Sequence, residues 1–230
     1  MYKYETHLHT SRVSKCARAT VEETLDFYKS INYDGVFITN HFIDGNINID
    51  PSCPYEEKIN FYASDYERAV QYGKEIGIKV FFGVEMSYSG TDFLIYGLDK
   101  EWFLNNPQIA DMEKREQLEY MMKCGALVIQ AHPYREASYI DHIRLFPRSV
   151  HGVEVINACR NELENKMAEI YAEHYGLLKF AGSDNHSADK QPRLAGMCSQ
   201  TPINSVDEFI SCVLNNKMNV FENDNPCITQ

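Results

Sequence analysis

The sequence has no long hydrophobic run and lacks several motifs that mark common cofactor and nucleophile sites. No apolar stretch approaches the roughly 20 residues that a transmembrane helix needs, and residues 1–5 lack the apolar core of a signal peptide. We therefore expect a cytoplasmic protein with no membrane partner. The absence of Gly-x-x-x-x-Gly-Lys-Ser/Thr, Gly-x-Gly-x-x-Gly and Gly-x-Ser-x-Gly motifs argues against the nucleotide sites and the serine nucleophile that they mark.

The cysteines and the charge narrow the class of protein further. The 7 cysteines are scattered from Cys16 to Cys227 with no Cys-x-x-Cys pair, so a zinc ribbon is not indicated. In a reducing compartment we expect most of these thiols to be free and buried. A net charge of -11 disfavours a nucleic-acid polymer as partner. With 230 residues, 44% of them hydrophobic, the chain fits one α/β domain over residues 1–230.

Short apolar runs alternate with amphipathic stretches along the chain. The predicted strands are 4–9, 35–39, 79–85, 93–97, 127–131, 152–156, 178–182 and 218–221. The predicted helices are 21–31, 57–76, 110–124, 140–145, 162–175 and 206–215. Thr20 with Glu23, and Ser205 with Glu208, have capping-box spacing. The alternation predicts a mostly parallel sheet or barrel with covering helices, and residues 44–56 form the candidate surface loop or lid.

Histidines and acidic residues recur at the ends of the predicted strands. The set is His7, His9, His41, Glu85, His132, Asp184 and His186. In a parallel α/β barrel the carboxyl ends of the strands meet at one mouth, and imidazole and carboxylate groups suit zinc, iron and manganese. One such histidine alone is more often a solvated polar residue, but five histidines and two acids at such places together predict a metal site. We assign the other three histidines, His142, His151 and His174, structural or surface roles.

The motifs at these positions resemble the PHP superfamily, named after polymerase and histidinol phosphatase. They are His7-Leu8-His9-Thr10, Ile38-Thr39-Asn40-His41, Gly83-Val84-Glu85, Ala131-His132-Pro133, Gly152-Val153-Glu154-Val155-Ile156-Asn157 and Ala181-Gly182-Ser183-Asp184-Asn185-His186. The resemblance implies a distorted (β/α)7 barrel with a metal site at the carboxyl ends of its strands. It also implies two or three divalent ions, manganese, iron or zinc.

The resemblance further implies how the ligands are shared. His7, His9, Glu85 and Asp184 would bind the first ion. Glu85 would bridge to a second ion that also binds His132, and His41 with His186 would bind a third.

The sequence departs from the family pattern at three places. Lys15-Cys16 stands where the family often has a further ligand after His-x-His, which makes Cys16 a candidate extra ligand. Phe93 stands near the place of another family histidine. The usual Thr-Asp-His reads Thr39-Asn40-His41, so an acid that would orient a ligand is missing.

The function that these features favour is hydrolysis of a small phosphorylated substrate by a metal-activated water. The catalytic candidates are His132, His186 and Asp184, and the candidate phosphate-binding cations are Arg160, Arg193, Arg135 and Lys15. Two alternatives stay open at this point. One is a metal-dependent hydrolase of a C–N bond, similar to an amidohydrolase. The other is a non-catalytic metal-binding PHP domain.

Overall fold

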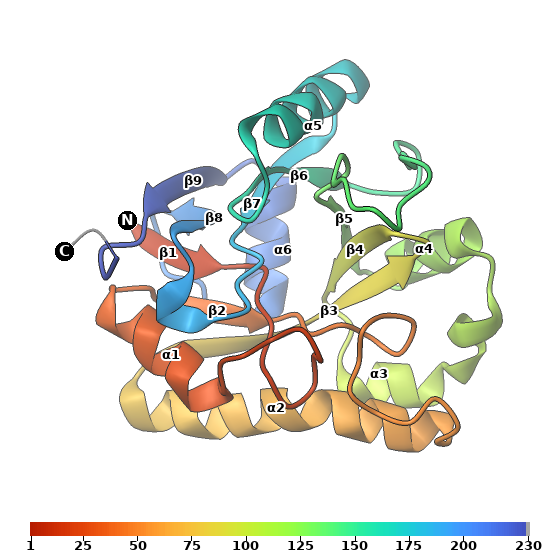
Figure 1. Ribbon diagram of the computed structural model, residues 1–230, viewed down its shortest axis with the longest axis horizontal. Helices are drawn as coiled ribbons and strands as arrows, with labels where there is room; N and C mark the ends of the chain where they lie inside the picture. The colour runs from red at the N-terminus through yellow and green to blue at the C-terminus, as the bar shows by residue number, and fades with distance from the viewer. Residues whose placement is uncertain (229–230) are drawn as a thin grey trace.

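The computed structural model describes residues 1–228, and its centre is one nine-stranded sheet rolled into a nearly closed barrel (Figure 1). The strand order is β7-β6-β5-β4-β3-β2-β1-β8-β9. The strands are β1 (Tyr2–Glu5), β2 (Gly35–Ile38), β3 (Lys79–Tyr88), β4 (Thr91–Tyr96), β5 (Leu127–Ala131), β6 (Gly152–Asn157), β7 (Leu178–Gly182), β8 (Arg193–Ser199) and β9 (Met218–Asp224). The expected α/β barrel is confirmed.

Helices cover the outside of the barrel and fill one end of it. They are α1 (Val21–Ser30), α2 (Tyr55–Ile76), α3 (Lys100–Asn105), α4 (Lys114–Lys123), α5 (Glu162–Tyr175) and α6 (Val206–Leu214), with 3-10 turns η1 (Pro107–Asp111) and η2 (Ala188–Lys190). The long helix α2 runs beside α1 along one side, and α6 lies behind the strands in Figure 1. Within residues 1–228 no helix is both long and apolar enough to cross a membrane.

The directions of the strands place six carboxyl ends at one rim. Four neighbouring pairs are parallel, namely β1–β2, β2–β3, β5–β6 and β6–β7. Strand β4 runs antiparallel between β3 and β5, so β5 points the same way as β3. The rim closes where Leu8, beyond β1, forms a parallel bridge with Asn185, beyond β7.

The expectation of a mostly parallel sheet was wrong, since the other four pairings are antiparallel. The cause at β3–β4 is a two-residue turn. Ser89 and Gly90 have φ values of 50° and 84°, and two consecutive positive values favour the tight hairpin that twists with its strands. At the other edge, β8 and β9 form an antiparallel extension beside β1.

The barrel core below the rim is aromatic. Phe209 of α6 lies 4.4 Å from Phe37, 5.6 Å from Tyr96 and 6.0 Å from Phe180, measured between ring centroids. These three rings come from β2, β4 and β7, so α6 packs into the barrel at the end away from the carboxyl rim. Burying such rings supplies much of the hydrophobic stabilisation of a domain of this size.

Most predicted elements are confirmed, with shifted ends. The predicted helix 140–145 was wrong: these residues are irregular, and the side chain of Gln130 donates to the Arg144 carbonyl (2.7 Å) and accepts from the Phe146 amide (3.2 Å). Strand β8 was missed because its sequence has no β-branched residue. Helix α3 was missed too, although Asp99 caps it by accepting from the Trp102 amide. The predicted caps at Thr20 and Ser205 are both present.

The loop predicted over residues 44–56 is irregular up to Pro54, and α2 begins at Tyr55, but the first part of the loop is held in place. Asp44 accepts from the Ser87 amide at 3.0 Å and pairs with the buried Lys114 at 2.9 Å. Ser14 and Ile47 form an antiparallel bridge. The first part of the loop is therefore fixed against the rim of the barrel.

A buried carboxylate beneath the rim holds the closing segments together. Glu5 accepts hydrogen bonds from the amides of Thr6, His7 and Ser183, and from the hydroxyl of Tyr28. Burial raises the pKa of Glu5 to about 7, although the bonds from Ser183, His7 and Tyr28 act in the opposite direction. Glu5 thus joins the chain before His7 to the chain before Asp184.

We predict that Tyr28→Phe lowers the free energy of unfolding by about 1–3 kcal/mol, because it leaves buried polar groups without partners. The Tyr28 hydroxyl donates to Glu5 at 2.7 Å and accepts from Asn185 at 3.0 Å. Tyr33→Phe is the matched control. Its ring lies 4.9 Å from that of Tyr28, but its buried hydroxyl has no hydrogen-bond partner in the described chain. Urea unfolding measures both variants, and equal losses would contradict the role given to Glu5.

Candidate metal centre

The structure brings all seven predicted ligand residues together at the carboxyl rim. His7 and His9 follow β1, His41 follows β2, and Glu85 lies in β3. His132 follows β5, and Asp184 and His186 follow β7. Five of the seven, His41, Glu85, His132, Asp184 and His186, line a cavity of about 480 Å³, while His7 and His9 are buried at its base.

Their donor atoms form three overlapping groups. The groups are His7, Glu85 and His132; His7, His9 and Asp184; and His9, His41 and His186. Within each group the ligand atoms lie within 4.8 Å of one another. Because His7 and His9 each belong to two groups, the three positions are neighbours in one continuous centre.

Neighbouring residues turn three of the imidazoles so that one nitrogen faces the centre. His7 Nδ1 lies 2.9 Å from Glu154 Oε1, His9 Nδ1 lies 3.2 Å from Ser14 Oγ, and His186 Nδ1 lies 2.7 Å from the Asp184 carbonyl. Each partner accepts a hydrogen bond from Nδ1, which leaves the Nε2 lone pair for a cation. Such outer partners commonly fix the tautomer of metal-binding histidines.

Several buried donor atoms in the centre have no hydrogen-bond partner within residues 1–228. They are His7 Nε2, His9 Nε2, His41 Nδ1 and Glu85 Oε2. Two pairs among these atoms and their neighbours lie at ion-pair distance without making a hydrogen bond, His7 Nε2 at 3.2 Å from Glu85 Oε1 and His41 Nδ1 at 2.6 Å from Glu85 Oε2. An unpaired buried polar atom costs about 1–3 kcal/mol, so four in one place call for a shared partner. Divalent cations satisfy nitrogen and oxygen atoms together, and the residues fit them.

The charges of the centre also favour a cation. Burial alone would raise the pKa of Glu85, but His41 and His7 hold it well below its usual range. Burial would likewise raise the pKa of Asp184, but His7 and His9 hold that pKa well below its usual range. Burial opposes protonation of His7, yet Glu154, Asp184 and Glu85 raise its pKa well above the ordinary value. The field that attracts a proton to His7 attracts a metal ion to the same nitrogen.

Two of the seven residues have strained backbones. His132 has a φ of 25° and Asp184 a φ of 55°, and both lack the freedom of glycine. Backbone strain of this kind concentrates at functional sites, where the surrounding structure holds it in place. Here His132 is held by a hydrogen bond from its amide to Glu154.

Glu154 is a functional residue that the sequence reasoning missed, although it lies in one of the quoted motifs. Its carboxylate, fully buried, accepts from His7, from the His132 amide at 3.1 Å and from Asn157 Nδ2 at 3.0 Å. One acid therefore orients ligand segments that follow β1 and β5. The available signal was a lone acid inside the apolar strand 152–157, where an unpaired charge would be costly.

Asn40 stands where the family has an acid, and the structure shows why an amide fits. Its Oδ1 accepts from the Thr10 amide and from Ser14 Oγ, and its Nδ2 donates to Thr10 Oγ1. Thr10 in turn donates to the buried Asp65. A carboxylate at position 40 would compete with Asp65 for the proton of the Thr10 hydroxyl. Asn40 instead accepts from Ser14 Oγ, and Ser14 Oγ in turn contacts His9 Nδ1 and orients that ring.

Asp92 is a second residue that was missed. The resemblance to the family pointed to Phe93, which is buried in the core on the other face of β4. Asp92 lies one residue earlier, lines the cavity, and places its Oδ2 3.8 Å from His132 Nε2. Burial and the charge of Glu85 raise its pKa. The alternation of side chains along a strand explains why the neighbour of Phe93 faces the centre.

The four predicted phosphate-binding cations separate into two pairs. Arg135 and Arg160 line the cavity, and Arg160 Nε is buried without a partner in the described part of the chain. Lys15 is exposed and is not among the lining residues. The guanidinium of Arg193 also lies away from the cavity lining, because it donates to the carbonyls of Ala158 and Arg160 and pairs with Glu222.

Cys16 lies at the rim of the cavity, with its Sγ 3.1 Å from His41 Nε2. Desolvation would raise the pKa of this thiol, but hydrogen bonds with His186 and His41 lower it to about 6. All seven cysteines are free, as expected. The expectation that most are buried was wrong, because only Cys198 is buried and Cys16, Cys124 and Cys227 are exposed.

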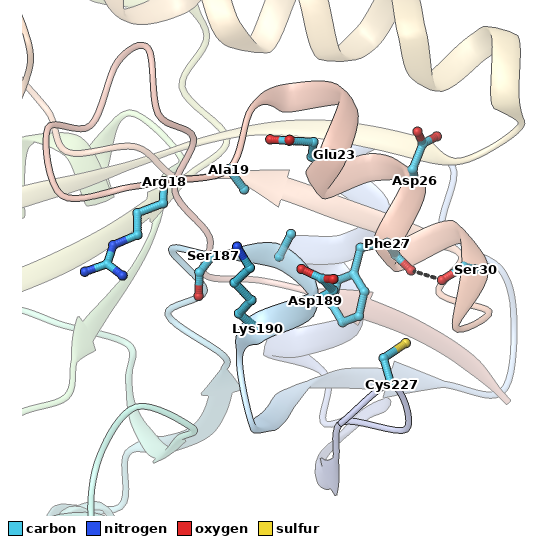
Figure 2. A pocket seen from close by; sticks show the side chains of 11 residues that line it. Arg18, Ala19, Glu23, Asp26, Phe27, Ser30, Ser187, Asp189, Lys190 and Cys227 are labelled. Atoms are coloured by element: carbon cyan, nitrogen blue, oxygen red, sulfur yellow. Dashed lines mark hydrogen bonds between the residues drawn. The ribbon is translucent and has the colours of Figure 1, made fainter. Parts of the chain in front are cut away.

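The three remaining histidines lie apart from the centre. His151 accepts from the Val128 amide through Nδ1, while His142 and His174 are exposed. A larger cavity of about 630 Å³ lies beside α1 and residues 187–190 and contains none of the seven ligand residues (Figure 2). Its walls mix Arg18 and Lys190 with acidic side chains, so they present no uniform charge.

Comparisons with known proteins agree with this fold. Residues 162–217 match a family described as PHP-associated, and a search of curated proteins finds no match. A two-domain protein from Bacteroides vulgatus containing a predicted PHP-like metal-dependent phosphoesterase is 13% identical, with a TM-score of 0.66 over 96% of this chain. This chain spans only 64% of that protein.

Two further solved structures cover nearly the whole chain. PsfC from Pseudomonas syringae is 15% identical, with a TM-score of 0.61, over 96% of this chain and 91% of that one. An amidohydrolase from Chromobacterium violaceum, with bound sulfate and no metal, is 14% identical, with a TM-score of 0.55, over 94% and 97% respectively. At these identities the likeness establishes the fold alone.

We predict that Glu154→Gln weakens metal binding about 10–100-fold, the usual effect of removing a residue that orients a ligand. The amide can keep one hydrogen bond to this region but cannot accept from all three present partners. Titration against a competing chelator measures the affinity. Glu222→Gln, which removes the acid paired with Arg193 outside the cavity, should leave the affinity unchanged. Equal affinities in both variants would show that Glu154 does not orient the ligands.

Proposed function

We propose that this chain, which has the fold of the PHP superfamily, is a metal-dependent hydrolase of small phosphate esters. The observation that carries the proposal is the convergence of seven imidazole and carboxylate side chains at one rim, with buried donor atoms that lack partners in the described chain. Two arginines line the same cavity. A centre for cations beside a site for an anion is the arrangement that phosphoryl transfer requires.

The ligand sharing follows the three groups of donor atoms. His7, His9, Glu85 and Asp184 would hold the first ion. Glu85 and His132 would hold the second, and the facing carboxylate of Asp92 supplies the oxygen that Phe93 cannot. His41 and His186 would hold the third. Two or three ions of manganese, iron or zinc suit these nitrogen and oxygen donors.

Bound ions would supply a nucleophilic water at neutral pH and neutralise phosphoryl oxygens. The remaining work belongs to the chain. Arg160 and Arg135 bind and orient the phosphate at the cavity wall. Asp184 holds negative charge beneath it, and His132 and His186 are the imidazoles from which a proton can reach the leaving oxygen. The carboxylate of Asp92 lies 3.5 Å from Arg135 Nη1 and holds the Arg135 guanidinium beside the cavity.

The two alternatives differ from this proposal in measurable ways. A hydrolase of C–N bonds would share the metal centre but cleave lactams or amides rather than phosphomonoesters. A non-catalytic domain would show metal-dependent melting without hydrolysis. A non-catalytic domain would be favoured if the chain offered no ligand atom at Lys15-Cys16 and near Phe93, but Cys16 and Asp92 line the cavity at those places. A panel of phosphomonoesters, cyclic phosphates and lactams separates the three.

We predict that the chain loaded with manganese, iron or zinc hydrolyses phosphomonoesters, and that Asp184→Asn lowers kcat/KM about 100-fold or more. The reason is that loss of a ligand carboxylate removes several kcal/mol of stabilisation from metal-assisted transition states. The control is His174→Gln, an exposed histidine at the end of α5. Cleavage of lactams but not of phosphate esters by the loaded protein would overturn the proposal.

We predict that Arg160→Ala lowers kcat/KM for phosphomonoesters about 10–100-fold, since a hydrogen bond to a charged group contributes about 1.5–3 kcal/mol. Lys15→Ala, which removes a cation outside the cavity, should leave it unchanged. Steady-state kinetics on one phosphomonoester measures both variants. If Lys15→Ala proved the more damaging, the phosphate would have to bind on the outer side of the 10–19 loop.

A further inference from the structure

Asp65 is a buried carboxylate that the proposed function does not use. It lies in the middle of α2, the helix that runs along the outside of the barrel in Figure 1, and only 1% of it is exposed. Aspartate is a poor residue for the interior of a helix, and a buried carboxylate is costly unless donors compensate it. Arg68, three residues further along α2, pairs with Glu22 instead. The Thr10 hydroxyl donates to Asp65 Oδ2 at 2.6 Å, so the carboxylate is directed at the loop that follows β1.

A chain of hydrogen bonds leads from Asp65 toward the candidate metal centre, and each bond has a fixed direction. A carboxylate only accepts, so the Thr10 hydroxyl donates its single hydrogen to Asp65. The Thr10 oxygen accepts from Asn40 Nδ2 at 2.8 Å. The Asn40 oxygen faces the other way and accepts from Ser14 Oγ at 2.8 Å. Because every hydrogen points toward Asp65, each bond polarises the next.

The chain of hydrogen bonds ends at His9. Ser14 Oγ has already donated its hydrogen, so it can only accept from His9 Nδ1, which lies 3.2 Å away. His9 Nε2 then presents its lone pair toward Asp184 Oδ1, at 3.3 Å. From Asp65 to His9 every side chain in the sequence of bonds is at most 1% exposed. The charge of Asp65 therefore acts on the imidazole with little screening by water.

Positions 40 and 65 accommodate one carboxylate between them. Thr10 lies between the two side chains and has a single hydroxyl hydrogen, which only one acid can accept. The side chain at the other position must then donate to the Thr10 oxygen, as the amide of Asn40 does. This protein has the acid at position 65 and the amide at position 40, and the exchanged pair would satisfy the same Thr10 hydroxyl.

We propose that Asp65 is a positioning residue that strengthens the binding of the ion held by His9. Its charge strengthens the hydrogen bond that His9 Nδ1 donates, and an imidazole with a stronger outer hydrogen bond is a better metal ligand. The inference rests on the proposed metal centre but not on the identity of the substrate. The competing role is structural, in which Asp65 only fastens α2 to the loop after β1.

The test moves the acid along the chain of bonds. Asp65→Asn should weaken one bound ion about threefold to tenfold, less than the loss expected for a residue that touches a ligand directly. Adding Asn40→Asp should restore the affinity at least to that of the unchanged protein, because the carboxylate then lies closer to His9. Glu67→Gln is the matched control. It removes an exposed acid from the same helix and should leave the affinity unchanged. Titration of the full chain with manganese and with zinc, against a competing chelator, measures each variant.

A second measurement needs no metal. The NMR resonance of the His9 Nδ1 proton reports the strength of its hydrogen bond. It should move upfield in Asp65→Asn and return downfield in the double variant, while melting of the metal-free proteins reports their stability. A structural role would change the melting temperature and leave the resonance in place.

Three outcomes overturn the inference: unchanged affinity in Asp65→Asn, a double variant that binds no better than Asp65→Asn, or a His9 resonance that does not move. If the unchanged protein bound neither manganese nor zinc, the proposed function would fail. The resonance of the metal-free protein would then still decide whether Asp65 acts on His9.

Discussion

The structure depends on gathering five carboxylates in the interior at one end of a barrel. Glu5, Glu85, Asp92, Glu154 and Asp184 are each at most 6% exposed. Burying a charge costs several kcal/mol unless opposite charge or hydrogen-bond donors compensate it. Three of the five, Glu85, Asp92 and Asp184, face the cavity, where histidines supply incomplete compensation. Bound cations would complete this compensation, and the free energy lost by burying the charges would then favour cation binding.

The buried acids lie in layers, and the chain compensates the charge of each layer differently. Glu5 is satisfied wholly by the chain, through amides and Tyr28, and it closes the barrel. Glu154 lies one layer higher and turns His7 inward while holding the strained backbone of His132. Among the five acids, only Glu85 has a carboxylate oxygen without a hydrogen-bond partner in the described chain. The bonds of Glu154 fix the direction of the His7 imidazole and the backbone of His132 beforehand, which lowers the reorganisation needed on binding a cation.

The sequence alone was sufficient to predict the barrel and the gathering of its ligands, because His-x-His, Asp-x-His and the apolar runs before them are local patterns. What it could not supply depends on neighbours distant along the chain. In the sequence Glu154 is a single acid in an apolar strand. Its role depends on a contact with His7, which lies 147 residues away along the chain. Asp92 was hidden because the register of β4 decides which of two adjacent residues faces inward. Residues 140–145 are irregular, and the side chain of Gln130 binds the backbone on both sides of Leu145, again a contact between residues distant along the chain.

The aromatic core and the candidate centre lie in successive layers of the barrel. The rings around Phe209 pack below the buried acids, and Tyr96 joins the two layers by donating its hydroxyl to the Thr6 carbonyl. At the rim, ligands lie in short segments after the strands rather than within them, and six of the seven lie beyond or at the end of regular pairing. Such segments can vary in residue type without disturbing the sheet. The thiol at position 16 and the amide at position 40 both lie in such segments, outside the paired strands.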